Sequence, residues 1–193
     1  IDQTASPPTP ATGALTPDGI AQSLGALLPD GAVVVDESLT SGRNLFPFTD
    51  NASPHDWLQL TGGAIGIGIP LATGAAVACP DRRVVCLQAD GSGMYTVQGL
   101  WTQARENLNV TTVIYANGSY AILRNELANL GVAEPGRNAS DMMDLGRPDI
   151  DWVSLARGMG VEAERVTTAE RFNDAFRASL GKNGPFLIEA DVR

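Results

Sequence analysis

The hydrophobic and polar positions of this 193-residue chain change between a helical and a strand period from residue 16 onward. Thr16 before Pro17 predicts a helix start, and Ile20, Leu24 and Leu28 fall on one face of that helix. Apolar runs without alternation then recur, which is typical of parallel strands buried on both faces. The predicted strands are 32–35, 84–87, 111–115, 161–166 and 186–190. The predicted helices are 17–28, a helix of small residues that ends near 78, 95–107, 151–159 and 169–180. Residues 46–60 and 131–149 are predicted to be irregular.

This order of elements predicts an α/β protein, a three-layer α/β/α arrangement around a mostly parallel sheet. Residues 15–193 are predicted to form one domain. Residues 1–14 are predicted to be a linker or a frayed N-terminal tail, because they are polar and rich in proline. The chain starts at Ile1 rather than at Met, and we therefore expect it to be the last domain of a longer polypeptide.

The composition and net charge of the chain argue against some classes of binding partner. The chain is 44% hydrophobic and carries 22 acidic against 13 basic side chains, a formal net charge of −9. Such a surface repels nucleic acids and anionic membranes, so we expect neither as a partner. No apolar run is long enough to cross a bilayer. The two cysteines, Cys79 and Cys86, form neither a disulfide framework nor a metal-binding pattern, which favours a reducing, cytoplasmic location.

Polar residues follow three of the predicted strands. The carboxyl ends of parallel strands meet at one edge of a sheet, and this places 36–40, 90–93 and 117–120 together. Asp90 and Asn117 offer oxygen ligands of the kind that Mg²⁺ prefers, and a backbone carbonyl next to Gly118 offers another. Gly91 and Ser92 begin a helix and expose amides suited to a phosphate. The pattern indicates a magnesium–diphosphate site; the alternative is that Asp90 and Asn117 are ordinary helix caps and turn formers.

Two adjoining segments carry a family resemblance. GGAIGIGIPLATGAAVACPDRRVVCLQADG and ADGSGMYTVQGLWTQARENLNVTTVIYANGSY resemble the signature of thiamine diphosphate-dependent enzymes, a Gly-Asp-Gly triplet followed later by Asn-Asn. The group is that of acetolactate synthase, benzoylformate decarboxylase and pyruvate oxidase. The resemblance runs from about residue 36 to 120. It implies the thiamine diphosphate-binding fold and the C-terminal cofactor-binding domain of such an enzyme.

The resemblance implies a role for each matching residue. The cofactors would be thiamine diphosphate and Mg²⁺, and the implied metal ligands are Asp90, the side chain of Asn117 and the backbone carbonyl of Ser119. The implied diphosphate contacts are Leu39, through its amide, Thr40, Gly91, Ser92 and, through its amide, Tyr120. The Gly63 carbonyl would accept from the aminopyrimidine amine. Ile65 would be the bulky residue between the two cofactor rings; by periodicity alone it is a plain core residue.

The chain departs from the signature at two positions, where Ala89 and Ala116 replace the first glycine and the first asparagine. Neither position supplies a metal ligand in the family pattern, so we expect metal binding to survive. The glutamate that activates the cofactor belongs to an earlier domain in this family, and nothing here matches it. Glu37, Glu106 and Glu126 are predicted to be surface or capping residues.

The resemblance also implies partners. The pyrimidine-binding domain would come from a neighbouring subunit, and the full enzyme would be a homodimer or homotetramer. This fragment alone would be inactive and would self-associate weakly at most. Some relatives bind FAD in a middle domain, and the resemblance leaves a flavin requirement open.

The implied reaction is decarboxylation of a 2-oxo acid with carboligation to an acceptor, as in acetolactate synthase. Two alternatives stay open: a simple 2-oxo acid decarboxylase of the benzoylformate type, and a non-catalytic module whose cofactor site has decayed. The single histidine, His55, is a candidate for facing substrate, although a loop residue hydrogen-bonded to Asp56 or water is the simpler interpretation. Residues 131–149 are a lid candidate, with a surface loop or subunit contact as the alternative.

Overall fold

Six parallel strands form a single sheet within residues 8–132 and 134–193, which are the residues that the computed structural model describes. Their order across the sheet is β2-β1-β3-β4-β6-β5. The strands are β1 (Ala32–Glu37), β2 (His55–Gln59), β3 (Val84–Ala89), β4 (Val110–Ala116), β5 (Glu162–Val166) and β6 (Phe186–Asp191). The predicted α/β class with a parallel sheet is confirmed.

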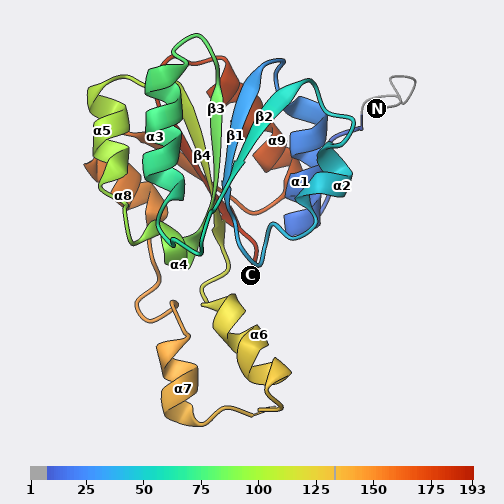
Figure 1. Cartoon of the computed structure of the whole chain (residues 1–193), viewed down its shortest axis with the longest axis vertical. Coiled ribbons are helices and arrows are strands. Elements are labelled where there is room, and N and C mark those ends of the chain that lie inside the picture. The colour runs from blue at the N-terminus through green and yellow to red at the C-terminus, as the bar shows by residue number, and fades with distance from the viewer. Residues whose placement is uncertain (1–7, 133) are drawn as a thin grey trace.

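Helices cover both faces of the sheet (Figure 1). One face packs against α1 (Pro17–Leu27), α2 (Leu45–Thr49) and α9 (Ala169–Leu180), and the other against α3 (Gly68–Ala78), α5 (Gly99–Arg105) and α8 (Trp152–Gly158). A short α4 (Asp90–Gly93) lies at the carboxyl edge of the strands, and α6 (Ala121–Asn129) and α7 (Arg137–Met142) project beyond that edge. Each layer closes over its own apolar core, which is the arrangement that a sheet buried on both faces requires.

Most of the predicted elements are present with small changes at their ends. The Thr16 hydroxyl caps α1 by accepting from the Gly19 amide at 3.0 Å, as the Thr-Pro pair predicts. The predicted helix over 95–107 is shorter, because α5 begins only at Gly99.

The prediction that residues 46–60 are irregular is wrong, since this segment contains most of α2 and all of β2. β2 is an edge strand that pairs only with β1 among the described residues. One face and one edge of it stay open, so its sequence lacks the continuous apolar run by which the inner strands are recognised. The irregular segment predicted over 131–149 likewise contains α7.

Part of the predicted linker packs on the domain. The Ala11 amide donates to Ser23 Oγ at 3.1 Å, its carbonyl accepts from Asn173 Nδ2 at 2.9 Å, and the Gly13 amide donates to Glu170 at 2.7 Å. Residues 1–7 of the linker lie outside the described residues, and the domain boundary stays a prediction. Across the described ranges, every helix is too short or too polar to span a bilayer.

The strand order puts a change of direction between β1 and β3. The chain runs from β1 to β2 on one side, and β3 then pairs with β1 on the other side. In open α/β sheets ligands bind outside the carboxyl ends of the strands at such a switch point. The loops after β1, β3 and β4 are therefore the place to look for a site.

Candidate functional site

The carboxylate of Asp90 ties together the loops that follow β3 and β4. It is 3% exposed and stands directly after β3. Its Oδ1 accepts from the Gly91 amide at 2.8 Å and its Oδ2 from the Gly118 amide at 2.7 Å. Burial raises the pKa of Asp90 above its ordinary value, and these backbone amides oppose that shift. A cation beside the carboxylate would favour its ionised form further.

Two more oxygens stand on the loop after β4. Asn117 Oδ1 accepts from the Ser119 amide at 2.9 Å, which orients the amide side chain. The Ser119 carbonyl accepts from the Ala121 amide at 2.9 Å. A carboxylate, a side-chain amide oxygen and a carbonyl are hard oxygen ligands, which suit Mg²⁺. No group of three or more His, Cys, Asp and Glu side chains that could hold a metal is found in the described part of the chain, so any metal would depend on this mixed donor set.

A narrow polar cleft of about 30 Å³ lies between these loops and the loop after β1. Most of its lining residues are small or carry a polar group, and they are Ser38, Leu39, Thr40, Ser41, Ala89, Asp90, Gly91, Ser92, Asn117, Ser119, Tyr120, Ala121 and Ile122. Leu39 adopts φ +52°, a left-handed conformation that costs a leucine about 1–2 kcal/mol and is often found at functional sites. Asp36 Oδ1 stabilises this turn by accepting from the Ser38 amide at 2.9 Å.

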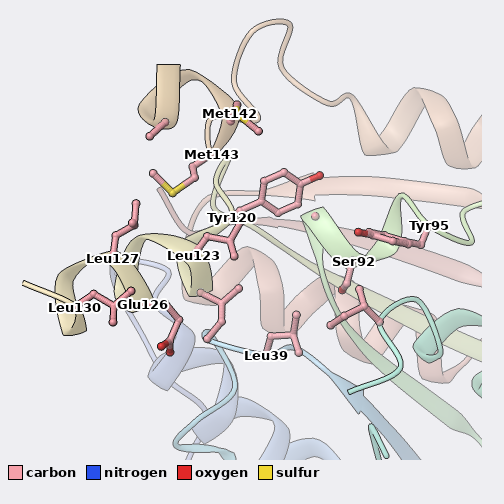
Figure 2. A pocket seen from close by; sticks show the side chains of 14 residues that line it. Leu39, Ser92, Tyr95, Tyr120, Leu123, Glu126, Leu127, Leu130, Met142 and Met143 are labelled. Atoms are coloured by element: carbon pink, nitrogen blue, oxygen red, sulfur yellow. The ribbon is translucent and has the colours of Figure 1, made fainter. Parts of the chain in front are cut away.

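A larger apolar cavity of about 660 Å³ adjoins the polar cleft. The two share Leu39, Gly91, Ser92, Tyr120 and Ile122. The cavity is lined by Ile65, by Tyr95 and by side chains of α6 and α7. Figure 2 shows Tyr95 on the opposite side of the cavity from Leu127 and Leu130. Ile65 is 42% exposed there, so it is not the core residue that periodicity alone predicts. Together the two spaces offer polar contacts at one end and apolar contacts at the other.

Tyr120 and Gly63 already use the backbone groups that the resemblance assigns to the cofactor. The Tyr120 amide donates to the Met143 carbonyl at 3.0 Å, and the predicted diphosphate contact would require this bond to open. The Gly63 carbonyl accepts from the Ile65 amide at 2.9 Å. The Tyr120 ring packs against Gly91, where an added Cβ would lie 2.6 Å from a ring carbon. Glycine is therefore the only residue type at position 91 that lets the Tyr120 ring approach so closely.

For His55 and Glu37 the sequence left alternatives open, and their surroundings favour one of them. His55 begins β2 and pairs in register with Ala32, at the amino end of the sheet and so opposite the edge that carries Asp90. Its Nδ1 lies 2.7 Å from the Ser53 carbonyl, so the structure favours a structural role. Glu37, predicted to be a surface or a capping residue, is a buried capping residue: it is 1% exposed and its carboxylate accepts from the Gly66 and Gly68 amides at the start of α3. Sequence reasoning missed this contact because the partners are 29 and 31 residues away.

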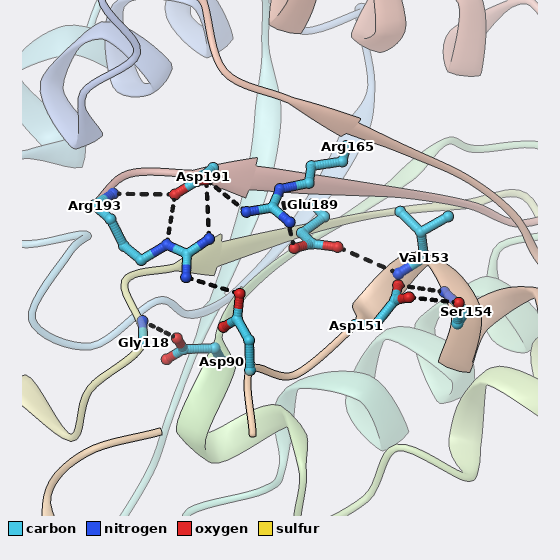
Figure 3. A network of polar contacts seen from close by, with 10 residues as sticks. Asp90, Gly118, Asp151, Val153, Ser154, Arg165, Glu189, Asp191 and Arg193 are labelled. Carbon is cyan, nitrogen blue, oxygen red and sulfur yellow. Dashed lines mark hydrogen bonds and ion pairs between the residues drawn. The ribbon is translucent and has the colours of Figure 1, made fainter. Parts of the chain in front are cut away.

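A network of ion pairs supports the loop after β4 from the C-terminal side (Figure 3). Arg193 donates to Asp191 at 2.9 Å and to Asp149 at 2.8 Å, and the Arg193 guanidinium holds the pKa of Asp191 well below its ordinary value. The Val192 amide donates to the Ala116 carbonyl at 3.2 Å. The side chain of Arg193 also passes close to Gly118. The C-terminal strand thus helps to hold Asn117 and Gly118 in place.

The fold and this site, a polar cleft beside an apolar cavity at the switch point of a parallel sheet, are those of a cofactor-binding α/β domain. Residues 40–190 match the family model described as "Thiamine pyrophosphate enzyme, C-terminal TPP binding domain". The chain belongs to this family, as its resemblance predicts.

Individual relatives agree with this assignment. The chain is 58% identical over 189 residues to a Mycobacterium tuberculosis protein named "Putative acetolactate synthase large subunit IlvX", with 97% of this chain and 37% of that protein covered. It is 32% identical over 181 residues to benzoylformate decarboxylase of Pseudomonas aeruginosa, covering 94% of this chain and 33% of that protein.

Among solved structures, the thiamine diphosphate-dependent 4-hydroxybenzoylformate decarboxylase of Rhodococcus jostii RHA1 superimposes with a TM-score of 0.84 at 34% identity. The match covers 95% of this chain and 34% of that one. The chain thus spans only about a third of the length of these relatives.

The left-handed backbone of Gly118 gives a test of the loop that carries Asn117. Gly118 has φ +66°, and a Cβ there would lie 3.4 Å from Arg193 Cδ. Gly118→Ala is expected to lower the free energy of unfolding by about 1 kcal/mol, because alanine is strained in this conformation. The measurement is denaturant unfolding.

Gly74→Ala is the matched control for that substitution. Gly74 is exposed inside α3, and an added Cβ there meets nothing within 4 Å. Alanine is a better helix former than glycine, so this variant is expected to be more stable by about 0.5–1 kcal/mol. Effects of the same sign at both positions would contradict the importance of backbone conformation at Gly118.

Proposed function

We propose that this chain binds thiamine diphosphate through Mg²⁺ and supports decarboxylation of a 2-oxo acid with carboligation to an acceptor, as part of an acetolactate synthase-like enzyme. The observation that supports it best is the continuity of the polar cleft around Asp90 with the apolar cavity beside Ile65. The oxygens and amides around the first space are suitable contacts for a metal and a diphosphate, and the apolar lining of the second suits aromatic rings. The high identity to the Mycobacterium tuberculosis relative favours the synthase over other members of the family.

In this proposal different residues of the chain contact the metal, the diphosphate and the rings of the cofactor. Asp90, Asn117 and the Ser119 carbonyl hold Mg²⁺. The diphosphate is held by amides and hydroxyls of the loops after β1, β3 and β4, from Leu39, Thr40, Gly91, Ser92 and Tyr120. The Gly63 carbonyl accepts from the aminopyrimidine amine, and Ile65 separates the rings. When bound, thiamine diphosphate supplies the electron sink for breaking the bond next to the 2-oxo carbon.

The residues present fit these groups. Ala89 has φ −72° and ψ 147°, an extended conformation that costs alanine nothing. Ala116 ends β4 as an ordinary strand residue. Neither departure from the family signature therefore distorts the loops that carry Asp90 and Asn117. This argues against a decayed cofactor site.

The exposed apolar side chains around the cavity support a partner domain. Leu123, Leu130 and Met142 are 49%, 79% and 78% exposed, and such a group of large apolar side chains is usually covered. We propose that the pyrimidine-binding domain of a neighbouring subunit covers them in a homodimer or homotetramer. That domain would supply the activating glutamate, so this chain alone would not turn over substrate. α6 and α7 would then form one wall of the substrate site; of the two, α7 belongs to the segment 131–149 of the lid hypothesis.

The central prediction concerns Asp90. Asp90→Asn keeps the shape of the side chain and removes its charge, so it is expected to weaken Mg²⁺-dependent binding of thiamine diphosphate at least tenfold. The measurement is calorimetric titration of the protein at its natural length, with and without Mg²⁺. Asp174→Asn on α9, where the side chain is 67% exposed, is the control and should bind like wild type. Unchanged affinity in Asp90→Asn would favour the decayed-site alternative.

A second prediction concerns Ile65. Ile65→Ala is expected to weaken thiamine diphosphate binding about tenfold through lost apolar contact, with little change in the free energy of unfolding because the side chain is 42% exposed. Calorimetry and denaturant unfolding measure the two effects. Val77→Ala, at a 63% exposed position of α3, should change neither. A stability loss without an affinity loss would make Ile65 a core residue after all.

The simple decarboxylase remains the second candidate, because the Rhodococcus jostii structure that superimposes well is named as a decarboxylase. Product analysis of the protein at its natural length distinguishes the two. Incubation with pyruvate as the 2-oxo acid probe should give a carboligated product. Release of the aldehyde alone would identify a decarboxylase.

A further inference from the structure

A buried glutamate joins two segments of the site that are far apart in the sequence. Glu37 is the last residue of β1 and is 1% exposed. Its Oε1 accepts from the Gly66 amide at 2.5 Å and its Oε2 from the Gly68 amide at 2.6 Å. Gly68 begins α3, whose N-cap residue Ile67 has no capping side chain. The carboxylate on β1 therefore caps α3, where a negative charge is favourable.

The same carboxylate is linked to the polar cleft through Gln88. Gln88 lies beside Glu37 in the register of β1 and β3 and is fully buried. Its Nε2 donates to Glu37 Oε2 at 3.1 Å and to Ser92 Oγ at 2.5 Å. Ser92 Oγ in turn donates to the Ala89 carbonyl at 3.2 Å. A continuous chain of hydrogen bonds thus runs from the loop 61–68 to the residue that follows Gly91.

The packing around this chain of bonds is tight. A Cβ on Gly68 would lie 2.2 Å from Gln88 Oε1 and 2.9 Å from Glu37 Oε2. Gln88 Oε1 is buried and has no hydrogen-bond partner among the described residues. A buried oxygen without a donor destabilises the folded state. The opposite orientation of the Gln88 side-chain amide would be worse, because it would place Gln88 Oε1 against the negatively charged Glu37 carboxylate. The orientation of Gln88 is therefore determined by its two donor contacts.

We propose that Glu37 and Gln88 are positioning residues that set the loop carrying Gly63 and Ile65 at a defined distance from Ser92 and Asp90. The inference rests on the proposed function, in which these two segments contact opposite ends of thiamine diphosphate. A ligand held at both ends binds tightly only if the two contact surfaces keep a fixed separation. Glu37 and Gln88 supply that constraint from inside the protein, without touching the cofactor.

A purely structural role for Glu37 is the alternative, and the chain contains a matched control for it. Glu189 on β6 is 2% exposed and caps α8 by accepting from the Val153 amide at 3.3 Å. It also pairs with Arg165. It contacts neither the loop 61–68 nor Ser92 in any described hydrogen bond or ion pair. Glu189→Gln therefore removes a buried, helix-capping charge of the same kind without a hydrogen bond to the loop 61–68 or to Ser92. Its link to the ion pairs behind Asn117 runs only through Arg165, which keeps its own pair with Asp191 in this variant.

The test is a double-mutant cycle in the protein at its natural length, with Mg²⁺-dependent affinity for thiamine diphosphate measured by calorimetry. Glu37→Gln should weaken binding about tenfold, because a glutamine amide cannot accept from both glycine amides. If Glu37 acts through the loop that carries Ile65, this loss shrinks to about threefold or less when Ile65→Ala is already present. Glu189→Gln should leave the affinity within twofold of wild type while lowering the free energy of unfolding.

Gln88→Met provides an independent variant of similar volume in case Glu37→Gln does not fold. It removes both donors and should weaken binding severalfold, again with a smaller effect in the Ile65→Ala background. Wild-type affinity in Glu37→Gln or Gln88→Met, or effects that simply multiply with that of Ile65→Ala, would overturn the inference. If wild type itself shows no Mg²⁺-dependent binding, or Asp90→Asn binds as well as wild type, the proposed function fails instead.

Discussion

The parallel register of β1, β3 and β4 is the constraint on which the site depends. Glu37 pairs with Gln88, and Ala89 pairs with Tyr115, so the three strands end at nearly the same level. The register alone therefore brings together the loops that follow these three strands. The hydrogen bond from the Gly118 amide to Asp90 then joins the loops after β3 and β4. A shift of the register by one residue would turn the side chains at the strand ends to the opposite face of the sheet and separate the polar groups of the site.

Buried acids organise the edges of this sheet. Asp90, Glu37 and Glu189 each stand at or near a strand end, and each accepts from backbone amides of a neighbouring segment. Burying a carboxylate is unfavourable, and amide donors offset that cost. For Asp90 the offset is incomplete, because burial still raises its pKa. Burial raises the pKa of Glu189 as well, but Glu189 lies beside Arg165, whereas no ion pair with Asp90 is found among the described residues.

The site is closed on the side of the sheet and open on the side of α6 and α7. The sheet and the loops around Asp90 supply buried polar groups, whereas α6 and α7 add apolar side chains such as Leu130 and Met142 that are largely exposed. The partner domain proposed above would lie against this open side of the cavity.

The sequence by itself determined the inner strands and which polar residues stand at the carboxyl edge of the sheet. Fully buried strands such as β3 and β4 leave continuous apolar runs, and Asp90 and Asn117 follow them directly, so local pattern suffices. β2 could not be recognised, because an edge strand needs no such run. The role of Glu37 and the exposure of Ile65 were decided only by the tertiary structure. The amides that Glu37 accepts from are about thirty residues away, and Ile65 has no packing partner on its cavity side among the described residues. Periodicity along the chain carries no information about contacts between distant segments.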